Sequence, residues 1–229
     1  VLAVILARGG SKAIKKKNMA DLNGHPLLAY TICEARLSKH ITDIVVSSDD
    51  DTIIKTAKDY GALAPFKRPK ELSGDKATSV ECVLHATRLM EELRGYHYDF
   101  VVDLLCTNPF KTSFDIDSAL ELQFETNSDS VIGVMRLDDH HPIRIKKLEN
   151  GFIRDFCLPE IPESRRQDLK PDAYIRNGSI YSMRRDMLEK KIRLGTEKSL
   201  AYVMPRERTV NIDEPMDLEI ARILMEKNP

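Results

Sequence analysis

The chain has 229 residues, of which 42% are hydrophobic, and its 35 basic and 36 acidic residues leave a formal net charge of −1. A chain of this size can form one full hydrophobic core and a small appendage, and a charge near zero excludes the bulk field that draws proteins to nucleic acid or membranes. Four scattered cysteines without a C-x-x-C pair, and no apolar run near the roughly 20 residues of a membrane helix, predict a cytoplasmic protein.

Apolar runs alternate with helical patterns along the first 140 residues. Short apolar runs predict strands at residues 1–6, 43–48, 62–66, 100–105 and 130–135. Apolar residues at helical spacing predict helices between them, at residues 26–37, 50–60, 78–93 and 113–125. This β-α-β-α order predicts an α/β fold with a mainly parallel, Rossmann-like sheet and helices on both faces.

Residues 141–175 break this rhythm, because they are rich in proline and charge and show little periodicity. One interpretation is a long solvated loop, but unstructured loops of more than about 15 residues are uncommon in compact domains. We therefore predict an inserted arm at 141–175 and a core made of residues 1–140 and 176–229. The second part of the core is predicted to hold strands at 178–183, 199–204 and 209–212, and a helix at 215–226.

The arm also carries apolar side chains that a solvated loop would not need, namely Phe152, Ile153, Phe156, Leu158 and Ile161. Exposed apolar clusters of this kind commonly mark interaction sites. Because the sheet core is complete without these residues, we expect them to be buried against a second copy of the chain, in a homodimer.

The loop after the first strand combines two glycines with a cluster of cations, within residues 7–18. Glycine lets backbone N–H groups turn toward a ligand at close range, and Arg8, Lys12 and Lys17 can neutralise phosphate oxygens. The spacing fits neither a P-loop nor a dinucleotide-binding fingerprint. The pattern predicts a polyphosphate site, and the alternative is an ordinary turn with solvated lysines.

Further polar segments follow other predicted strands, and in a parallel sheet such strand ends meet at one edge. Arg68 can reach a phosphate or a ribose. Asp213, opposite the cationic loop, offers the carboxylate that a Mg²⁺-nucleotide site needs. For Asp213 and for the acidic segment 49–51, the alternative is capping of the next helix.

Taken together, these segments resemble the CMP-sialic acid synthetases, the acylneuraminate cytidylyltransferases, over nearly the whole chain. The motifs that carry the resemblance are residues 7–12 with Lys17-Asn18, Leu22-Asn23-Gly24-x-Pro26-Leu27, residues 45–50, Arg68-Pro69-x-Glu71-Leu72, residues 104–112, His140-His141-Pro142, Asn177-Gly178-x-Ile180-Tyr181 and Ile212-Asp213. The resemblance implies a nucleotidyltransferase fold and a reaction that joins CMP from CTP to a nine-carbon sugar acid. It also implies a Mg²⁺ cofactor, release of pyrophosphate and a homodimer formed through the inserted arm.

The resemblance assigns roles to individual residues as well. It places catalytic roles on Lys17, Arg8 and Asp213. Nucleotide contacts are implied for Arg8, Ser11, Lys12, Lys17, Asn18, Arg68, Ala77 and Ser79. We expect sugar contacts from Thr107, Asn108, Lys111, His141, Arg165 and Arg166, the two arginines reaching from the arm of the second subunit. Metal ligation is expected of Asp213 and Asn211. For His141, the alternative to a sugar contact is a structural role in a turn before the arm.

Four positions depart from the usual pattern of that family: Ala13 replaces a glycine, Leu105 a glutamine, Lys111 an arginine and Asn211 an aspartate. The change at Leu105 leaves the sugar open among sialic, legionaminic and pseudaminic acids. Two other functions stay as alternatives, a sugar-1-phosphate nucleotidyltransferase that uses another NTP and a nucleotide-binding module without catalysis.

Overall fold

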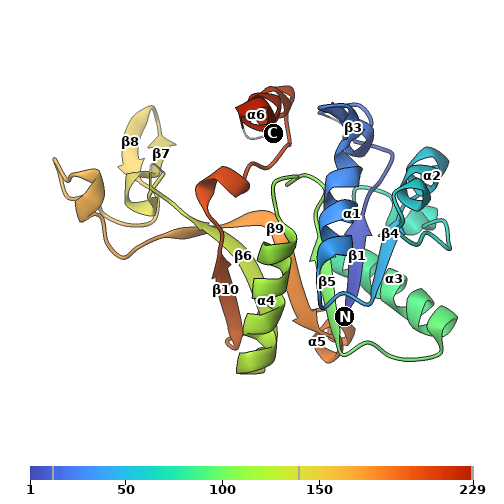
Figure 1. Cartoon of the computed structure of the whole chain (residues 1–229). Helices are drawn as coiled ribbons and strands as arrows, with labels where there is room; N and C mark the ends of the chain where they lie inside the picture. Colours follow the sequence, from blue (N-terminus) through green and yellow to red (C-terminus); the bar gives the residue numbers. More distant parts are fainter. Residues whose placement is uncertain (12, 139, 228–229) are drawn as a thin grey trace.

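A six-stranded sheet forms the centre of the computed structural model, which describes residues 1–11, 13–138 and 140–227 (Figure 1). Its strands, in spatial order, are β10 (Ser199–Val203), β6 (Ser130–Arg136), β9 (Tyr174–Arg184), β5 (Phe100–Leu104), β1 (Leu2–Leu6) and β4 (Asp43–Ser47). β1 pairs in parallel with β4 and β5, and β10 with β6, whereas β9 runs antiparallel to both of its neighbours. The predicted α/β class with a mainly parallel sheet is confirmed.

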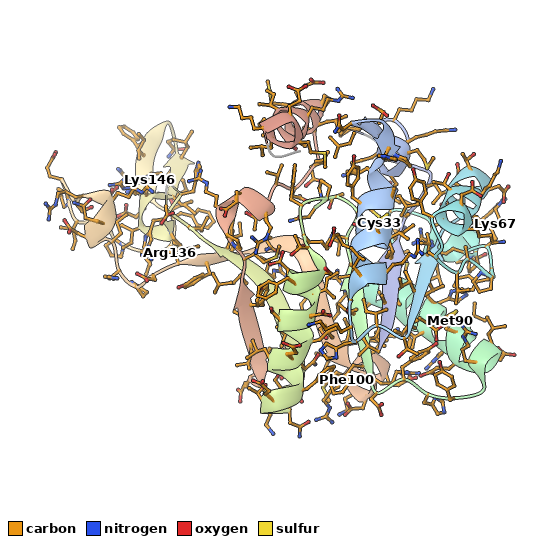
Figure 2. The ribbon with its side chains drawn as sticks, viewed as in Figure 1. Cys33, Lys67, Met90, Phe100, Arg136 and Lys146 are labelled. Carbon is orange, nitrogen blue, oxygen red and sulfur yellow. The ribbon has the colours of Figure 1, made fainter. Side chains whose placement is uncertain are left out.

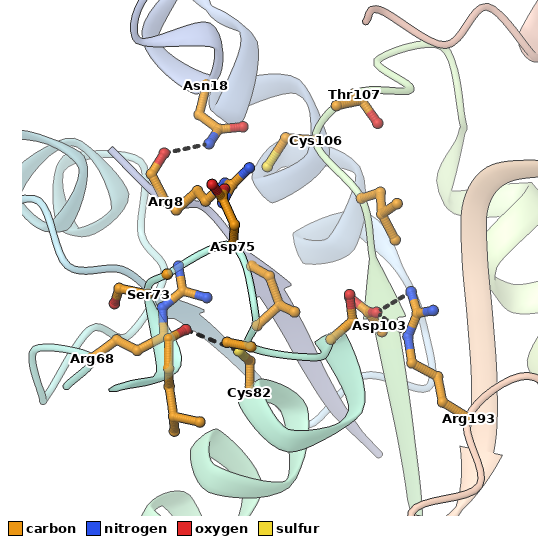
Figure 3. Close-up of a pocket in the computed structure, with 16 residues that line it drawn as sticks. Arg8, Asn18, Arg68, Ser73, Asp75, Cys82, Asp103, Cys106, Thr107 and Arg193 are labelled. Carbon is orange, nitrogen blue, oxygen red and sulfur yellow. Dashed lines mark hydrogen bonds and ion pairs between the residues drawn. The ribbon is translucent and has the colours of Figure 1, made fainter. Parts of the chain in front are cut away.

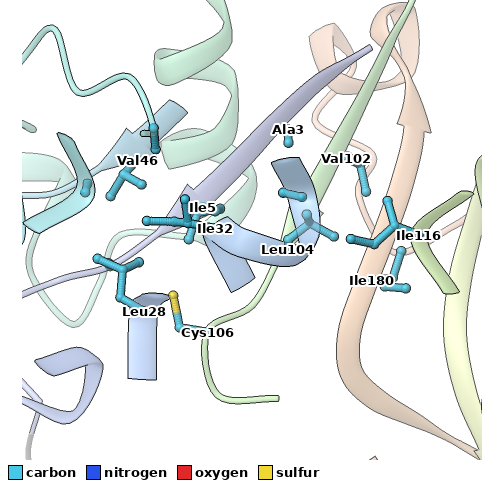
Figure 4. Close-up of a cluster of buried hydrophobic side chains, with 14 of the residues drawn as sticks. Ala3, Ile5, Leu28, Ile32, Val46, Val102, Leu104, Cys106, Ile116 and Ile180 are labelled. Atoms are coloured by element: carbon cyan, nitrogen blue, oxygen red, sulfur yellow. The ribbon is translucent and has the colours of Figure 1, made fainter. Parts of the chain in front are cut away.

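Helices cover both faces of this sheet, because successive residues of its central strands point to opposite sides. Ala3 and Ile5 pack with α1 (Leu27–Leu37), α2 (Asp51–Asp59) and α4 (Ser113–Thr126), in a cluster that Figure 4 shows. Leu2 and Val4 pack on the other side with α3 (Ser79–Arg94) and α5 (Arg185–Glu189). Burial on both sides explains the nearly continuous apolar runs of the strands.

Short elements connect this framework, and two predicted strands are absent from it. The connecting elements are η1 (Lys17–Met19), β2 (Asp21–Leu22), β3 (His25–Pro26), η2 (Lys70–Leu72) and η5 (Arg206–Arg208), and the final helix is α6 (Pro215–Lys227). The strand predicted at 62–66 is wrong except for one bridge, between Leu63 and Val45. Residues 209–212 form no strand either, because Ile212 donates its N–H to the loop carbonyl of Thr107 and not to a sheet neighbour. None of the helices described is long and apolar enough to cross a bilayer.

The segment 141–175 projects from the sheet beyond the end of β6 (Figure 1). It contains η3 (Pro142–Arg144), the antiparallel hairpin of β7 (Lys146–Glu149) and β8 (Phe152–Asp155), and η4 (Arg166–Asp168). Arg136 and Lys146 stand apart from the side chains of the core (Figure 2). Phe152 is 62% exposed, and Ile153, Phe156, Leu158 and Ile161 are exposed as well. The single chain therefore leaves the apolar side of the arm uncovered.

Candidate active site

A pocket of about 330 Å³ opens at the carboxyl ends of β1 and β5 (Figure 3). Its walls come from the loop after β1, the segment between η2 and α3, and the loop after β5. Six residues predicted from the sequence line it together: Arg8, Asn18, Arg68, Ala77, Ser79 and Thr107. Ligands bind at this edge in open α/β sheets, because loops from several strands converge there.

The loop after β1 lies against the start of α2, and this contact requires a glycine. The N–H of Gly9 donates to Oδ1 of Asp49 at 2.9 Å. A Cβ on Gly9 would lie 2.9 Å from the Cβ of Asp50, which is closer than side-chain carbons approach. Asp50 itself caps α2 by accepting from the N–H groups of Thr52 and Ile53, as the capping alternative predicted.

Polar side chains also hold this loop in shape. Ser11 donates its hydroxyl to the carbonyl of Ile14 at 2.5 Å and accepts from the N–H of Lys17 at 2.8 Å. Asn18 donates its amide N–H to the carbonyl of Arg8 at 3.0 Å. The loop is thus closed on itself by its own side chains. Lys12, the remaining predicted nucleotide contact of this loop, lies outside the described residues.

Arg68, which lines the pocket, has side-chain donors without partners among the described residues. Its backbone N–H is fixed by the carbonyl of Ser48 at 2.8 Å, and its side chain is buried. Within the described chain, Nε and Nη2 of Arg68 have no hydrogen-bond partner. Buried donors are normally paired, so this guanidinium is suited to a phosphate or ribose oxygen. Arg8, by contrast, forms an exposed ion pair of 3.0 Å with Asp75 across the pocket.

Beside the pocket, Asp213 joins the loop after β1 to the segment before α6. Its carboxylate accepts from Nζ of Lys17 at 2.8 Å and from the amide of Asn211. The N–H groups of Asp213 and Glu214 donate to the Asp217 carboxylate, so Asp217 serves the start of α6. The carboxylate of Asp213 is therefore directed to Lys17 and not to helix capping.

Asp213 and Asn211 also fit a magnesium ion. Oδ1 of Asn211 is buried and lacks a partner in the part of the chain that the structure describes. A carboxylate and an amide oxygen are the hard ligands that Mg²⁺ takes when substrate phosphates supply the rest. No group of three or more His, Cys, Asp or Glu residues positioned for a metal occurs among the described residues. The protein alone offers only part of a coordination sphere.

The predicted sugar contact Lys111 lies behind the pocket wall. Its side chain is 1% exposed, and Nζ donates to Oγ1 of Thr31 at 2.9 Å and to the carbonyls of Leu105 at 2.8 Å and Asn108 at 2.5 Å. Burial lowers the pKa of Lys111 to about 8. Its ammonium holds the loop that carries Thr107, and does not line the pocket; the side chain of Asn108 is likewise fully buried.

The sugar contacts predicted in the arm lie outside this pocket. His141 is buried, with Nε2 2.8 Å from the carbonyl of Pro171, and it lines a separate hollow at the base of the arm together with Arg166. Arg165 is exposed and paired with Asp168 at 2.7 Å. Neither arginine lines the pocket of its own chain, and their predicted role in a second subunit stays a prediction.

Two pocket residues, Asp103 and Arg193, were missed by sequence reasoning. They form an ion pair in the pocket wall, with Nε of Arg193 2.7 Å from Oδ2 of Asp103. The aspartate inside the apolar run FVVDLL was a usable signal, since a charge in a buried strand needs a partner. Its partner lies 90 residues further along the chain and gave no comparable signal.

Comparisons with known proteins identify relatives of this chain. Residues 2–226 match the family model described as cytidylyltransferase. The chain is 35% identical to the pseudaminic acid cytidylyltransferase of Campylobacter jejuni, over 99% of this chain and 97% of that protein. It is 32% identical to the N-acylneuraminate cytidylyltransferase of Escherichia coli, over 99% of this chain and 52% of that protein. The structure of a CMP:2-keto-3-deoxy-manno-octonic acid synthetase complexed with CTP superposes with a TM-score of 0.71 at 17% identity, over 100% of this chain and 99% of that one, which shows the shared fold.

Proposed function

We propose a reaction for this chain, which belongs to the cytidylyltransferase family: it transfers CMP from CTP to a nonulosonic acid and releases pyrophosphate. The observation that carries this proposal is the pocket that brings Arg8, Asn18 and Arg68 together at the carboxyl edge of the sheet. Of the candidate sugars, pseudaminic acid is favoured, because the relatives named for it match this chain over nearly their whole length.

The reaction is a single displacement at phosphorus. The anomeric hydroxyl of the sugar acid attacks the α-phosphorus of CTP and loses its proton, a new P–O bond forms, and the bond to the bridging oxygen breaks as pyrophosphate leaves. Such a step needs in-line positioning and neutralisation of charge more than a covalent nucleophile. Arg68 donates to the nucleotide through Nε and Nη2, and Arg8 exchanges its partner Asp75 for a phosphate oxygen. Lys17 keeps its contact with Asp213 and adds positive charge beside the phosphates.

The residues present also fit a divalent cation. Asp213 and the amide oxygen of Asn211 would hold Mg²⁺ beside the phosphates, where the bound ion supplies further neutralisation of charge. Lys17 lies against the same carboxylate, so it orients Asp213 as well as carrying charge of its own. Second-sphere contacts of this kind commonly set the direction of a metal ligand.

The active form is proposed to be a cytoplasmic homodimer. The uncovered apolar residues of the arm support a second copy as their partner, and four free cysteines support a reducing compartment. In a symmetric dimer, Arg165 or Arg166 would approach the partner's sugar site and pair with the carboxylate of the sugar acid.

Pyrophosphate release with four NTPs against pseudaminic, legionaminic and N-acetylneuraminic acids tests the reaction. Of the four NTPs, we expect only CTP to support turnover, and of the sugar acids we expect pseudaminic acid to give the highest kcat/KM. Turnover with another NTP and a sugar 1-phosphate would replace the proposal by the first alternative. Tight CTP binding by calorimetry, with no pyrophosphate from any sugar acid, would replace it by a nucleotide-binding module.

A further inference from the structure

The reaction proposed above leaves one buried carboxylate of the pocket without a role. Asp103 is 0% exposed in β5, where its neighbours in the sheet are Val4 of β1 and Tyr181 of β9. Its Oδ2 accepts from Nε of Arg193 at 2.7 Å and from Nη2 at 2.5 Å. Its Oδ1 is equally buried and has no hydrogen-bond partner among the residues that the structure describes.

The fold alone gives no reason for this charge pair. A buried acceptor without a partner has lost its hydration with no compensation. Burial accordingly raises the pKa of the Asp103 carboxyl, and the positive charge of Arg193 lowers it by less than burial raises it. Apolar residues of similar volume in place of a buried ion pair are often neutral or stabilising. The free oxygen therefore points to a ligand that donates a hydrogen bond.

The position of the pair favours the sugar acid over the nucleotide. In the pocket, Asp103 and Arg193 lie on the side away from Arg68 (Figure 3). Arg193 also lines a second hollow of about 500 Å³, in which Tyr181 and Asn211 take part, and its Cζ lies 4.1 Å from the centre of the Tyr181 ring. Arg193 thus lies between the nucleotide pocket and an adjoining space that Asn211 lines, and Asp103 faces the nucleotide pocket.

The chemistry of the two substrates points the same way. The triphosphate presents acceptor oxygens, which a carboxylate repels, so the donor comes either from the O–H and amide N–H groups of the nonulosonic acid or from the ribose and base of cytidine. The position of Asp103 away from Arg68 favours the nonulosonic acid. The acceptor must also reach the α-phosphorus, so it has to lie next to the nucleotide pocket. A site that pairs a substrate donor with a buried acceptor rejects analogues that lack the donor.

We propose that Asp103, held by Arg193, accepts a hydrogen bond from an O–H or N–H group of the sugar acid and thereby helps to select the sugar. Oδ2 fixes the carboxylate through Arg193, and Oδ1 receives the substrate donor. The Tyr181 ring stacks on the guanidinium of Arg193, so both Tyr181 and Asp103 hold this side chain in place. This inference rests on the proposed function.

The test removes both charges at once, in the double variant Asp103→Leu, Arg193→Met, so that no unpaired charge stays buried. We expect KM for the sugar acid to rise about 10- to 100-fold, with KM for CTP within about twofold of wild type and a changed ranking of sugar acids. CTP affinity is measured separately by calorimetry, without turnover. The matched control is Glu91→Leu, Arg185→Met, a similarly buried ion pair of 2.7 Å outside the pocket, which should leave both KM values unchanged.

Arg193→Lys provides a second variant that keeps the charge but loses the fork of two donors and the stacking on Tyr181. We expect a rise of a few fold in KM for the sugar acid alone, even if the double variant does not fold. An unchanged sugar KM in a folded variant overturns the inference while the proposed function stands, and a rise in KM for CTP alone assigns Asp103 to the nucleotide and overturns it too. No pyrophosphate release by the wild-type enzyme would instead overturn the proposed function.

Discussion

The loop after β1 and the arm at 141–175 both carry several cations, but the arm also leaves a group of apolar side chains exposed. In the loop, Gly9 donates to Asp49 and Asn18 to Arg8, so its backbone is fixed by internal hydrogen bonds. In the arm, the hairpin carries Phe152 and other uncovered apolar side chains. Both segments form hydrogen bonds of their own, so the difference lies in the exposed apolar side chains of the arm, which the proposed second copy would cover.

The strongest way to break this comparison is to remove Asp213, where the loop meets its proposed metal. Asp213→Ala should lower kcat by about 10³-fold or more, because the bound metal stabilises the charge of the transition state by several kcal/mol and the variant loses a ligand of that metal. The measurement is pyrophosphate release at saturating CTP and Mg²⁺. Asp217→Ala is the matched control, since it loses the contacts at the start of α6 and should cost only about 1 kcal/mol of stability. An Asp213→Ala protein that turns over normally would mean that the carboxylate has no catalytic part.

A second test concerns the cation that the loop directs toward the same carboxylate. Lys17→Ala should lower kcat by about 10²-fold, the scale of losing one preorganised donor to developing charge. Lys15→Ala is the control, because Lys15 is exposed in the same loop. If both variants lose the same small factor in steady-state kinetics, the loop provides only a general positive field and no placed charge.

A third test asks whether the exposed apolar side chains of the arm form the proposed dimer. Phe152→Asp with Phe156→Asp puts two charges on the uncovered face, and we expect loss of the dimer together with about tenfold or more of the activity. Sedimentation and activity are measured at the same protein concentrations. Lys147→Asp, on a half-exposed polar residue of the same hairpin, is the control and should leave both readouts near wild type. A fully active wild-type monomer would show that the arm is complete on its own.

The smallest expected effect concerns the loop after β5, which Lys111 holds from inside. The folded-state pKa of Lys111, about 8, lies below its usual value of 10.5, so between these values the unfolded chain binds more protons and rising pH favours the folded state. Between pH 7 and pH 9, the unfolding free energy of the wild type should rise by about 1 kcal/mol relative to Lys111→Met. Urea unfolding at both pH values measures this difference. A pH-independent difference would mean that Lys111 keeps an ordinary pKa.

Local patterns predicted most of the framework. Periodicity placed the helices that became α1 to α4 within one residue of their observed ends, because each has an apolar face and a clear start or stop. The prediction was wrong at 209–212, where a short apolar segment looked like a strand. Whether such a segment pairs with a sheet depends on a free neighbouring edge, which local pattern does not report.

In the candidate site, too, some features follow from local sequence and others from tertiary contacts. The sequence by itself determined the cationic glycine loop and the carboxylate opposite it, because residue type and spacing express that chemistry locally. Only the tertiary structure decided that Lys111 turns inward to three oxygens of its own chain, that Asp217 and not Asp213 serves the start of α6, and that Asp103 meets Arg193. These outcomes depend on which groups packing brings together across up to 90 residues of chain, and on which of them burial then forces into pairs.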